Sequence, residues 1–247
     1  MKLVWIQGKR SVEEAIQANR HIEKIYIAKG SSKKRIESLL KQASRRKIPC
    51  YWVPREQLDQ IAKQRNHQGI LAQVEAYEYA TLEECLQRAK VLEEDPFFLL
   101  LDGVEDPHNF GSILRTAEAT GVHGVVIPKN RAVGLTSTVA KTSAGAIEYV
   151  PVVRVTNLKR TADWLKEMGF WIIGSDGNAE QAYLEVDYRF PLALVIGNEG
   201  KGISRLMKEK CDFLVKLPMK GHMTSLNASV AAGILMYEVV RSRNFNV

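Results

Sequence analysis

The sequence of 247 residues predicts an α/β protein built from two domains, and three observations lead to this prediction. Short apolar runs bounded by turn residues alternate with helical patterns over most of the chain. A polar, acidic stretch interrupts this alternation at residues 77–95, and most of the excess positive charge lies before it. We therefore expect a first domain at 1–76, a linker containing a helix at 77–95, and a second domain at 96–247.

The first domain is predicted to be a small α/β sandwich. Its strands are expected at 22–28, 48–53 and 69–77, and its longer helices at 31–47 and 54–64. A short helix before them would be capped by Ser11, with Glu14 as the partner in a capping box.

The second domain is predicted to contain a doubly wound parallel sheet, because its apolar runs are short, continuous and suited to burial on both faces. Strands are expected at 97–102, 124–128, 149–155, 170–175, 191–197 and 212–218, and helices at 110–120, 136–144, 157–168, 203–209 and from near Ser225 to about Arg241. Such sheets bind ligands at the carboxyl ends of their strands, so the loops that follow the strands are the candidate site.

The charge of the chain is uneven. Residues 1–76 carry 16 Lys/Arg and 7 Asp/Glu, a net charge of +9, whereas residues 77–247 carry 19 and 21, a net charge of −2. A basic domain beside a near-neutral one indicates that the first binds a polyanion such as a nucleic acid. Lysines that only keep helix surfaces in solution would produce the same excess, so charge alone leaves both interpretations open.

Several classes of protein have no support in the sequence. The N-terminus lacks the apolar core of a signal peptide, and no apolar run approaches the length of a membrane helix. Cys50, Cys85 and Cys211 form no CxxC pair, which indicates a reducing cytoplasm and argues against disulfides and a cysteine zinc site. The histidines have no metal-ligand spacing, and no serine has the context of a hydrolase nucleophile, so we expect neither a metal nor hydrolase chemistry.

The first notable loop is LDGVEDPHNFGSILRTAEATG at 101–121. Asn109 is expected to cap a helix that Gly121 ends, and Arg115 lies within the first turns of that helix. A helix N-terminus with a nearby arginine is suited to binding phosphate. An exposed helix arginine without a function is the alternative interpretation.

The second notable loop is IGNEGKGIS at 196–204, whose glycine spacing matches neither a dinucleotide fingerprint nor a Walker loop. Its three glycines indicate unusual backbone conformations with open amides, and Glu199 in their midst is unlike a core residue. A tight strand-to-helix turn with an exposed glutamate would have the same sequence.

The third is LPMKGHMTSLNASVAAGILMYEVV at 217–240, in which Ser225 or Asn227 can cap the last helix. Small residues in its first turns allow another backbone to pack closely against it. An ordinary buried helix is the alternative.

Together the three loops, in this order and spacing, closely resemble the three motifs of the SpoU (TrmH-like) RNA 2′-O-methyltransferases. The resemblance covers 97–247, and no motif residue is missing. The stretches GKRSVEEAI (8–16) and NHQGILAQV (66–74) look like the ribosomal-protein-like substrate-binding domain of the RlmB branch, whose members methylate a guanosine of large-subunit (23S) ribosomal RNA.

The resemblance implies a SPOUT-type parallel sheet with a deep trefoil knot, a homodimer, and S-adenosyl-L-methionine as the cofactor. The residues that would hold the cofactor are Gly197, Leu217 and Leu226, with Ile196, Asn198 and Met219 nearby. The residues that match substrate and catalytic positions are Asn109, Arg115, Glu199, Ser225 and Asn227. The cations expected to bind RNA in the first domain are Lys9, Arg10, Lys33, Lys34, Arg35, Arg45 and Arg46.

Two roles for Arg115 remain open. The resemblance implies that it acts as the general base, but a guanidinium in a protein keeps its proton. It could instead bind the neighbouring phosphate and make the ribose hydroxyl more acidic. The RNA substrate is also open, since tRNA and the ribosomal RNA site of antibiotic-resistance methylases are alternatives to the guanosine site in 23S ribosomal RNA. A protein of another class, a non-catalytic RNA-binding factor in ribosome assembly, is a further alternative.

Overall fold

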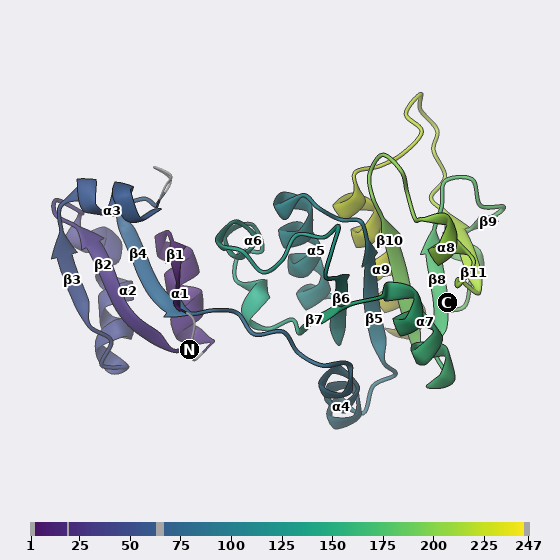
Figure 1. Cartoon of the computed structure of the whole chain (residues 1–247), viewed down its shortest axis with the longest axis horizontal. Helices are drawn as coiled ribbons and strands as arrows, with labels where there is room; N and C mark the ends of the chain where they lie inside the picture. The colour runs from purple at the N-terminus through teal and green to yellow at the C-terminus, as the bar shows by residue number, and fades with distance from the viewer. Residues whose placement is uncertain (1–2, 19, 63–66, 245–247) are drawn as a thin grey trace. The chain divides into compact units, whose positions relative to one another are not determined.

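The structure is a computed structural model that describes residues 3–18, 20–62 and 67–244, and the chain divides into two compact units (Figure 1). The N-terminal unit comprises the chain up to Glu78 together with Leu135–Tyr149, and the C-terminal unit comprises Tyr79–Gly134 and Val150–Val247. A segment from the middle of the second predicted domain therefore packs with the N-terminal unit.

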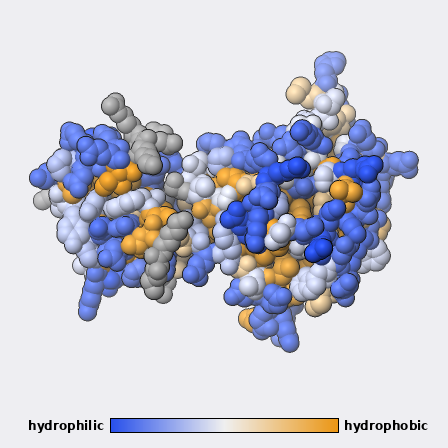
Figure 2. All heavy atoms as spheres, in the orientation of Figure 1, coloured by the Kyte–Doolittle hydropathy of each residue, from blue (hydrophilic) through white to orange (hydrophobic). Residues whose placement is uncertain are grey.

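The N-terminal unit contains a four-stranded sheet in the order β1-β4-β2-β3, in which only β2 and β3 run parallel. Helices α1 and α2 cover one face, where Ile25 and Ile27 of β2 are fully buried, and α3 covers part of the other through Leu58. Hydrophilic side chains surround smaller hydrophobic areas on the face seen in Figure 2. The elements are β1 (Leu3–Gln7), α1 (Lys9–Gln17), β2 (Ile22–Ala28), α2 (Lys33–Arg45), β3 (Cys50–Val53), α3 (Arg55–Ala62) and β4 (Ile70–Glu75).

Two features of this unit differ from the prediction. Strand β1 was not expected, because it pairs with β4, which lies more than 60 residues further along the chain, and local pattern does not reveal such pairing. The capping box of Ser11 and Glu14 is wrong, since α1 begins at Lys9 directly after Gly8. The Gly8 amide donates to the Ile70 carbonyl at 3.0 Å, so the helix starts where the strand ends.

The segment 135–149 is held on the N-terminal unit by a buried polar cluster. It contains α6 (Ser137–Thr142) and a short 3₁₀ helix, Ala146–Glu148. Arg20 and Glu148 form an ion pair at 3.0 Å with both side chains at least 90% buried, and the Tyr77 hydroxyl donates to Glu148 at 2.9 Å. The Arg20 guanidinium also lies over the Tyr77 ring. Burial of this kind is tolerated because both charges are paired and hydrogen-bonded.

The C-terminal unit contains a seven-stranded parallel sheet in the order β7-β6-β5-β10-β8-β11-β9. The predicted α/β class is confirmed, and the six expected strands are present, two of them with the expected ends and four with ends shifted by one to three residues. Helices α4, α7 and α8 share one hydrophobic core with the sheet. Helix α9 packs against α5 and β10 (Figure 1).

The strands of this unit are β5 (Phe97–Asp102), β6 (Gly124–Pro128), β7 (Val152–Val155), β8 (Trp171–Ser175), β9 (Gln181–Ala182), β10 (Leu192–Gly197) and β11 (Phe213–Lys216). Its helices are α4 (Leu82–Leu92), α5 (Pro107–Ala119), α7 (Leu158–Glu167), α8 (Arg205–Lys208) and α9 (Ala228–Asn244), with a 3₁₀ turn at Tyr183–Glu185.

The start of α5 corrects the expectation that Asn109 is a helix cap. The cap is Asp106, whose carboxylate accepts from the His108 amide at 2.8 Å, and Pro107 occupies the first helical position. Proline favours this position because its missing N–H would be unpaired there anyway. Asn109 therefore lies inside the first turn and is 94% buried. Gly121 follows the helix with a φ of +69°, as predicted.

Within the described residues, no helix combines the length and apolarity needed to cross a membrane. The same part of the chain contains no group of three or more His, Cys, Asp or Glu side chains placed to hold a metal ion. The three cysteines are free thiols.

Candidate active site

The carboxyl ends of the central strands bring the candidate loops together. Strand β10 lies between β5 and β8, and Gly197 at its end pairs in register with Asp102 at the end of β5. Parallel strands place the loops that follow them at one edge of the sheet. The loop 198–204 after β10 therefore lies beside the segments that follow β5 and β8.

The loop after β10 is closed so tightly that it requires glycine at its base. A Cβ atom on Gly197 would lie 2.2 Å from the backbone carbon of Gly202. The Asn198 side chain accepts from the Gly200 amide at 2.9 Å and donates to the Gly103 carbonyl at 2.9 Å. Asp102 accepts from the Ser204 amide at 2.8 Å. Side chains at the strand ends thus hold the loop in one conformation.

A cavity of about 340 Å³ lies against this loop. Its lining comes from residues 175–178 at the end of β8, residues 196–202 at the end of β10 and in the loop that follows, residues from 217 to 231 that run from the end of β11 into α9, and Lys208 of α8. All six residues expected to hold the cofactor are among them: Ile196, Gly197, Asn198, Leu217, Met219 and Leu226. The lining combines aliphatic side chains with exposed backbone, which suits a ligand that has both a flat apolar part and polar edges.

One wall of the cavity carries an ion pair that the sequence did not reveal. Asp176 follows β8 and pairs with Lys208 of α8. Burial acts to raise the pKa of Asp176, but the bond to Lys208 and a hydrogen bond from the Asn178 amide together outweigh burial and lower the pKa below its ordinary value. The carboxylate is therefore a fixed negative charge on this wall.

Asn109, Glu199 and Asn227, from three distant parts of the chain, form one polar network. The Asn109 amide nitrogen donates to Glu199 Oε1 at 2.8 Å, and the Asn227 amide nitrogen donates to Asn109 Oδ1 at 2.9 Å. Asn227 also donates to the same Glu199 oxygen. Each of the three side chains is thus oriented by the other two.

Asn227 also forms the N-terminal cap of α9. Its Oδ1 accepts from the Ser229 amide at 3.0 Å and from the Val230 amide at 3.4 Å. Of the two caps that the sequence left open, the structure therefore has Asn227 rather than Ser225. Glu199 Oε1 lies 3.4 Å from the Ala228 amide, at the positive end of the helix dipole, where a carboxylate is stabilised.

Arg115 and Ser225 lie outside this network. Ser225 is exposed and lines the cavity. Arg115 is exposed on α5, is not among the residues that line the cavity, and has no hydrogen bond or ion pair with another described residue. The structure thus joins three of the five expected catalytic residues, places Ser225 at the cavity, and leaves Arg115 apart.

Comparisons with known proteins identify the family. Residues 96–237 match the SpoU rRNA methylase family, and residues 5–80 match the RNA 2′-O ribose methyltransferase substrate-binding domain. The chain belongs to the SpoU methylase family. It is an S-adenosylmethionine-dependent RNA ribose 2′-O-methyltransferase.

Individual relatives of this SpoU enzyme agree with the family match. A Bacillus subtilis (strain 168) protein that carries the name of the TrmH tRNA/rRNA methyltransferase family is 54% identical over 240 residues, which are 97% of this chain and 96% of the relative. The SpoU methyltransferase AviRb of Streptomyces viridochromogenes, solved with AdoMet, has a TM-score of 0.79 at 26% identity and covers 97% of this chain and 90% of its own. The A. aeolicus TrmH/SpoU tRNA modifying enzyme has a TM-score of 0.55 at 30% identity, but covers 64% of this chain and 83% of its own.

The cations expected to bind RNA lie in two places on the N-terminal unit of the SpoU enzyme. Lys9 and Arg35 line a pocket, whereas Arg45 lies at the opposite end of α2. Arg46 donates to the Ile16 carbonyl at 2.8 Å, and Arg10 pairs with Glu14 at 3.1 Å. Lys34 is exposed, and the side chain of Lys33 is outside the described part of the structure.

Sequence reasoning missed two carboxylates of the SpoU site, Asp102 and Asp176. Asp102 ends β5, and Asp176 follows β8. The position of an acidic residue at the carboxyl end of a predicted parallel strand was the signal that could have found both.

Proposed function

We propose that this SpoU methyltransferase modifies the ribose of a guanosine in 23S ribosomal RNA, in the cytoplasm, acting on the free RNA or on an assembling ribosomal particle. The match of residues 5–80 to a substrate-binding domain supports a substrate larger than the reacting nucleotide. The tRNA modifying enzyme from A. aeolicus aligns with only part of this chain, which favours ribosomal RNA over tRNA. The resemblance of the N-terminal domain to the RlmB branch is what points to a guanosine of 23S RNA, and the cavity lined by all six expected cofactor residues supports methyl transfer from S-adenosylmethionine.

Gly197, Leu217 and Leu226 are the residues that would hold S-adenosylmethionine, with Ile196, Asn198 and Met219 around them. Their fit rests on the bare backbone at Gly197, where no side chain can be accommodated, and on the aliphatic lining that suits an adenine ring. When bound, the cofactor supplies an electrophilic methyl group on a sulfonium. The protein must therefore position the nucleophile, a ribose hydroxyl, and assist the loss of its proton, because the hydroxyl is a very weak acid.

Arg115 is the residue proposed to assist that hydroxyl. An exposed guanidinium with no hydrogen bond or ion pair to another described residue is available to bind a phosphate bidentately. By holding the phosphate, Arg115 would fix the position of the reacting ribose, and the positive charge of its guanidinium would favour the ionised hydroxyl. Either the phosphate or a water then accepts the proton, which leaves the guanidinium charged throughout.

Asn109, Glu199 and Asn227 are proposed to shape the substrate side of the cavity. Since each amide is held by the network, their remaining hydrogen-bonding groups have fixed directions toward RNA. Ser225, exposed at the rim with its hydroxyl available, is proposed to contact the substrate.

A homodimer is proposed to complete the site. Arg115 is outside the cavity lining of its own chain, so a second copy is the source from which an arginine would reach it. Val230, Ile234 and Tyr237 lie on one face of α9 and are 50%, 36% and 56% exposed. Apolar side chains in such a stripe are typical of a helix that packs against a partner. The deep trefoil knot implied by the resemblance belongs to the same proposal.

Two measurements test the proposed function. Calorimetry should show S-adenosylhomocysteine binding to the purified enzyme, and a non-catalytic assembly factor would show none. Ribose methylation mapped across ribosomal RNA and tRNA from a strain that lacks the gene should reveal one missing modification, on a guanosine of 23S RNA. A modification missing from tRNA, or from another ribosomal RNA site, would replace the proposed substrate.

A further inference from the structure

The N-terminal unit contains a pocket of its own, separate from the cavity of the candidate active site. It has a volume of about 280 Å³ and is formed by residues 28–32 at the end of β2 and after it, by the first turns of helices α1, α2 and α3, and by Gln68 and Ile70 at the start of β4. Eleven residues line it: Lys9, Ala28, Lys29, Gly30, Ser31, Ser32, Arg35, Ile36, Arg55, Gln68 and Ile70. Four of them are cations and none is a carboxylate, so the recess carries a concentrated positive charge.

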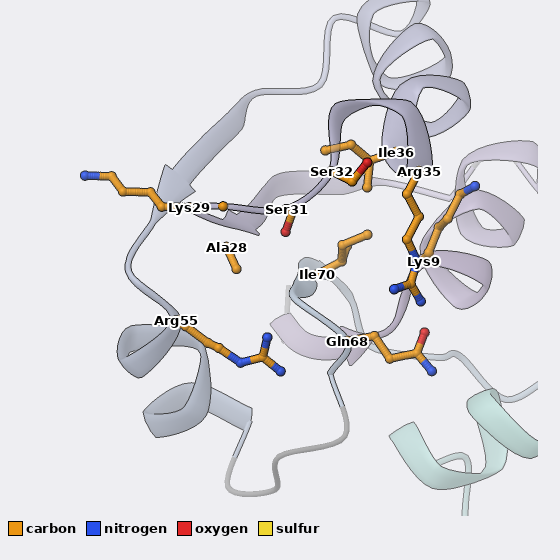
Figure 3. A pocket seen from close by; sticks show the side chains of 11 residues that line it. Lys9, Ala28, Lys29, Ser31, Ser32, Arg35, Ile36, Arg55, Gln68 and Ile70 are labelled. Carbon is orange, nitrogen blue, oxygen red and sulfur yellow. The ribbon is translucent and has the colours of Figure 1, made fainter.

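Most of the cations in this pocket have no ion pair with a described carboxylate. Lys9 has an ion pair with Glu13 at 3.5 Å, whereas Lys29, Arg35 and Arg55 form none with the carboxylates that the structure describes. Figure 3 shows the guanidinium groups of Arg35 and Arg55 extending from α2 and α3 toward the same open space, while Lys29 points away from it. Two guanidinium groups facing one hollow repel each other unless an anion lies between them.

Gln68 lines the pocket and lies between two residues whose positions are fixed by contacts, His67 and Gly69. His67 is fully buried, accepts from the Gly69 amide at 3.0 Å through Nδ1, and contacts Asp59 at 2.8 Å through Nε2. Gln68 has a φ of +52°, a left-handed conformation that costs a residue with a side chain free energy. Gly69 is also left-handed, and a Cβ atom there would lie 3.1 Å from the Ser31 hydroxyl. The loop therefore fixes the backbone at Gln68, whose exposed side chain lines the pocket together with Arg35 and Arg55.

The N-terminus of α2 adds neutral donors to the same wall. Ser32 is the cap residue of this 13-residue helix, yet its side chain makes no capping hydrogen bond. The first amides of the helix thus lack a side-chain acceptor, and amides of this kind bind phosphate oxygens.

We propose that this pocket binds one unpaired nucleotide of the RNA substrate. Arg35 and Arg55 hold its phosphate, together with the amides at the start of α2, and Gln68 forms hydrogen bonds to the edge of its base. The pocket volume of about 280 Å³ is just below the usual range for small-molecule sites, about 300–1,000 Å³, so the pocket has room for no more than a single nucleotide. A base in an A-form duplex stays stacked and cannot enter, so the site selects unpaired RNA. The inference deepens the proposed function and rests on it for the identity of the RNA.

Filter binding of the full-length enzyme to a 23S ribosomal RNA transcript tests the phosphate contact. The variant R35Q/R55Q should bind about tenfold to hundredfold more weakly than the wild type, because it loses charge-assisted hydrogen bonds. Its plot of log affinity against log KCl should be shallower by about 1. The control is K41Q, which removes one exposed charge from the same helix, where Lys41 pairs with Glu37. Equal binding of R35Q/R55Q and K41Q would overturn the proposal.

Competition measurements test the nucleotide. A single-stranded oligoribonucleotide should displace the transcript more effectively than a duplex of the same sequence, and the variant Q68A should keep the salt slope but lose preference among oligonucleotides of different sequence. If inorganic phosphate at the same concentration competes as well as the oligonucleotide, the pocket is a simple anion site and the proposal is wrong.

The same preparations separate this inference from the proposed function. If the wild type binds S-adenosylhomocysteine and methylates 23S RNA, but R35Q/R55Q binds RNA normally, the pocket inference fails alone. If the wild type does not methylate 23S RNA, yet single-stranded RNA binding depends on Arg35 and Arg55, the proposed substrate fails and the nucleotide pocket stands.

Discussion

The N-terminal pocket and the C-terminal cavity are lined by different kinds of chemical group. The N-terminal pocket is lined by long cations on the surface, among them Arg35 and Arg55, and contains no carboxylate. The C-terminal cavity is lined by backbone at Gly197 and by Glu199, whose carboxylate accepts hydrogen bonds from Asn109 and Asn227 behind it. Long charged side chains provide affinity that salt weakens gradually, whereas a cavity set by backbone tolerates little change.

This difference assigns separate tasks to the two units. The N-terminal unit can retain RNA through several partly redundant contacts, so single substitutions there should have graded effects. The C-terminal cavity must align three atoms for methyl transfer, and a displacement of about 1 Å at such a site can cost about 100-fold in rate. Changes in the C-terminal unit should therefore divide sharply into severe and silent ones.

Substitution of Arg115 should give the largest effect expected in the C-terminal unit, where changes are predicted to be either severe or silent. Substitution R115A should lower the single-turnover methylation rate about 100- to 1,000-fold at saturating RNA and cofactor, the range seen when one transition-state donor is removed. R115K should remain poor, because an ammonium cannot replace a bidentate fork. S-adenosylhomocysteine affinity should be unchanged, and R160A, which removes an exposed arginine of α7, should behave as the wild type. Near-normal turnover by R115A would remove Arg115 from the mechanism.

Gly197 tests the requirement for backbone in the cavity. G197A places a methyl group within 2.2 Å of the Gly202 backbone, so the loop must move. We expect a loss of stability of about 1–3 kcal/mol, typical of overpacking, and a severe loss of S-adenosylhomocysteine binding by calorimetry. G221A is the matched control, since a Cβ atom at that position meets nothing within 4 Å. Unchanged cofactor affinity in G197A would show that the cavity does not depend on this close approach.

Asn227 allows its capping role to be separated from its role in the network. N227A should cost about 1 kcal/mol of unfolding free energy, as the loss of a helix cap does, and should also slow methylation about tenfold. Asn157 caps α7 through hydrogen bonds from the Lys159 and Arg160 amides, so N157A provides the same capping loss away from the cavity. Denaturant unfolding and single-turnover rates of both variants decide the matter. If N157A slows methylation equally, the rate effect comes from stability alone.

The sequence predicted those strands whose apolar residues form a continuous local run. The apolar runs at 97–102 and 124–128 match β5 and β6 residue for residue, because central parallel strands are apolar on both faces. Strand β1 has five residues and pairs only at long range with β4, and β9 has two residues, so neither is long enough to give a clear local signal. In the DPHN stretch, Asp106 and Asn109 are both capable caps, and Pro107 decided between them.

The sequence allowed the three loops of the site to be predicted, but not the contacts among their side chains. The motif resemblance pointed to all six residues of the cavity lining that were expected to hold the cofactor. The contacts among Asn109, Glu199 and Asn227 join residues 28 to 118 positions apart, and only tertiary packing determines them. Asp176 lies in the sequence DGN after a strand, a pattern typical of a turn, and its carboxylate accepts from the Asn178 amide in that turn, so the pattern alone does not mark it as a site residue.

Asp176 gives the smallest expected effect, and it tests whether the cavity wall holds a fixed charge. The pKa of Asp176 is lower in the folded enzyme than in the unfolded chain, so the unfolded chain binds a proton first as the pH falls. Its stabilising contribution is therefore complete above about pH 5 and disappears as the pH falls through the folded pKa. Thermal unfolding between pH 7 and pH 3 should show a flatter acid limb for D176N than for the wild type. D187N should flatten it less, because the Asp187–Arg189 pair is exposed and screened by solvent. Identical acid limbs for D176N and the wild type would mean that solvent screens Asp176 as well, and the C-terminal cavity would then resemble the N-terminal pocket more than its hydrogen bonds indicate.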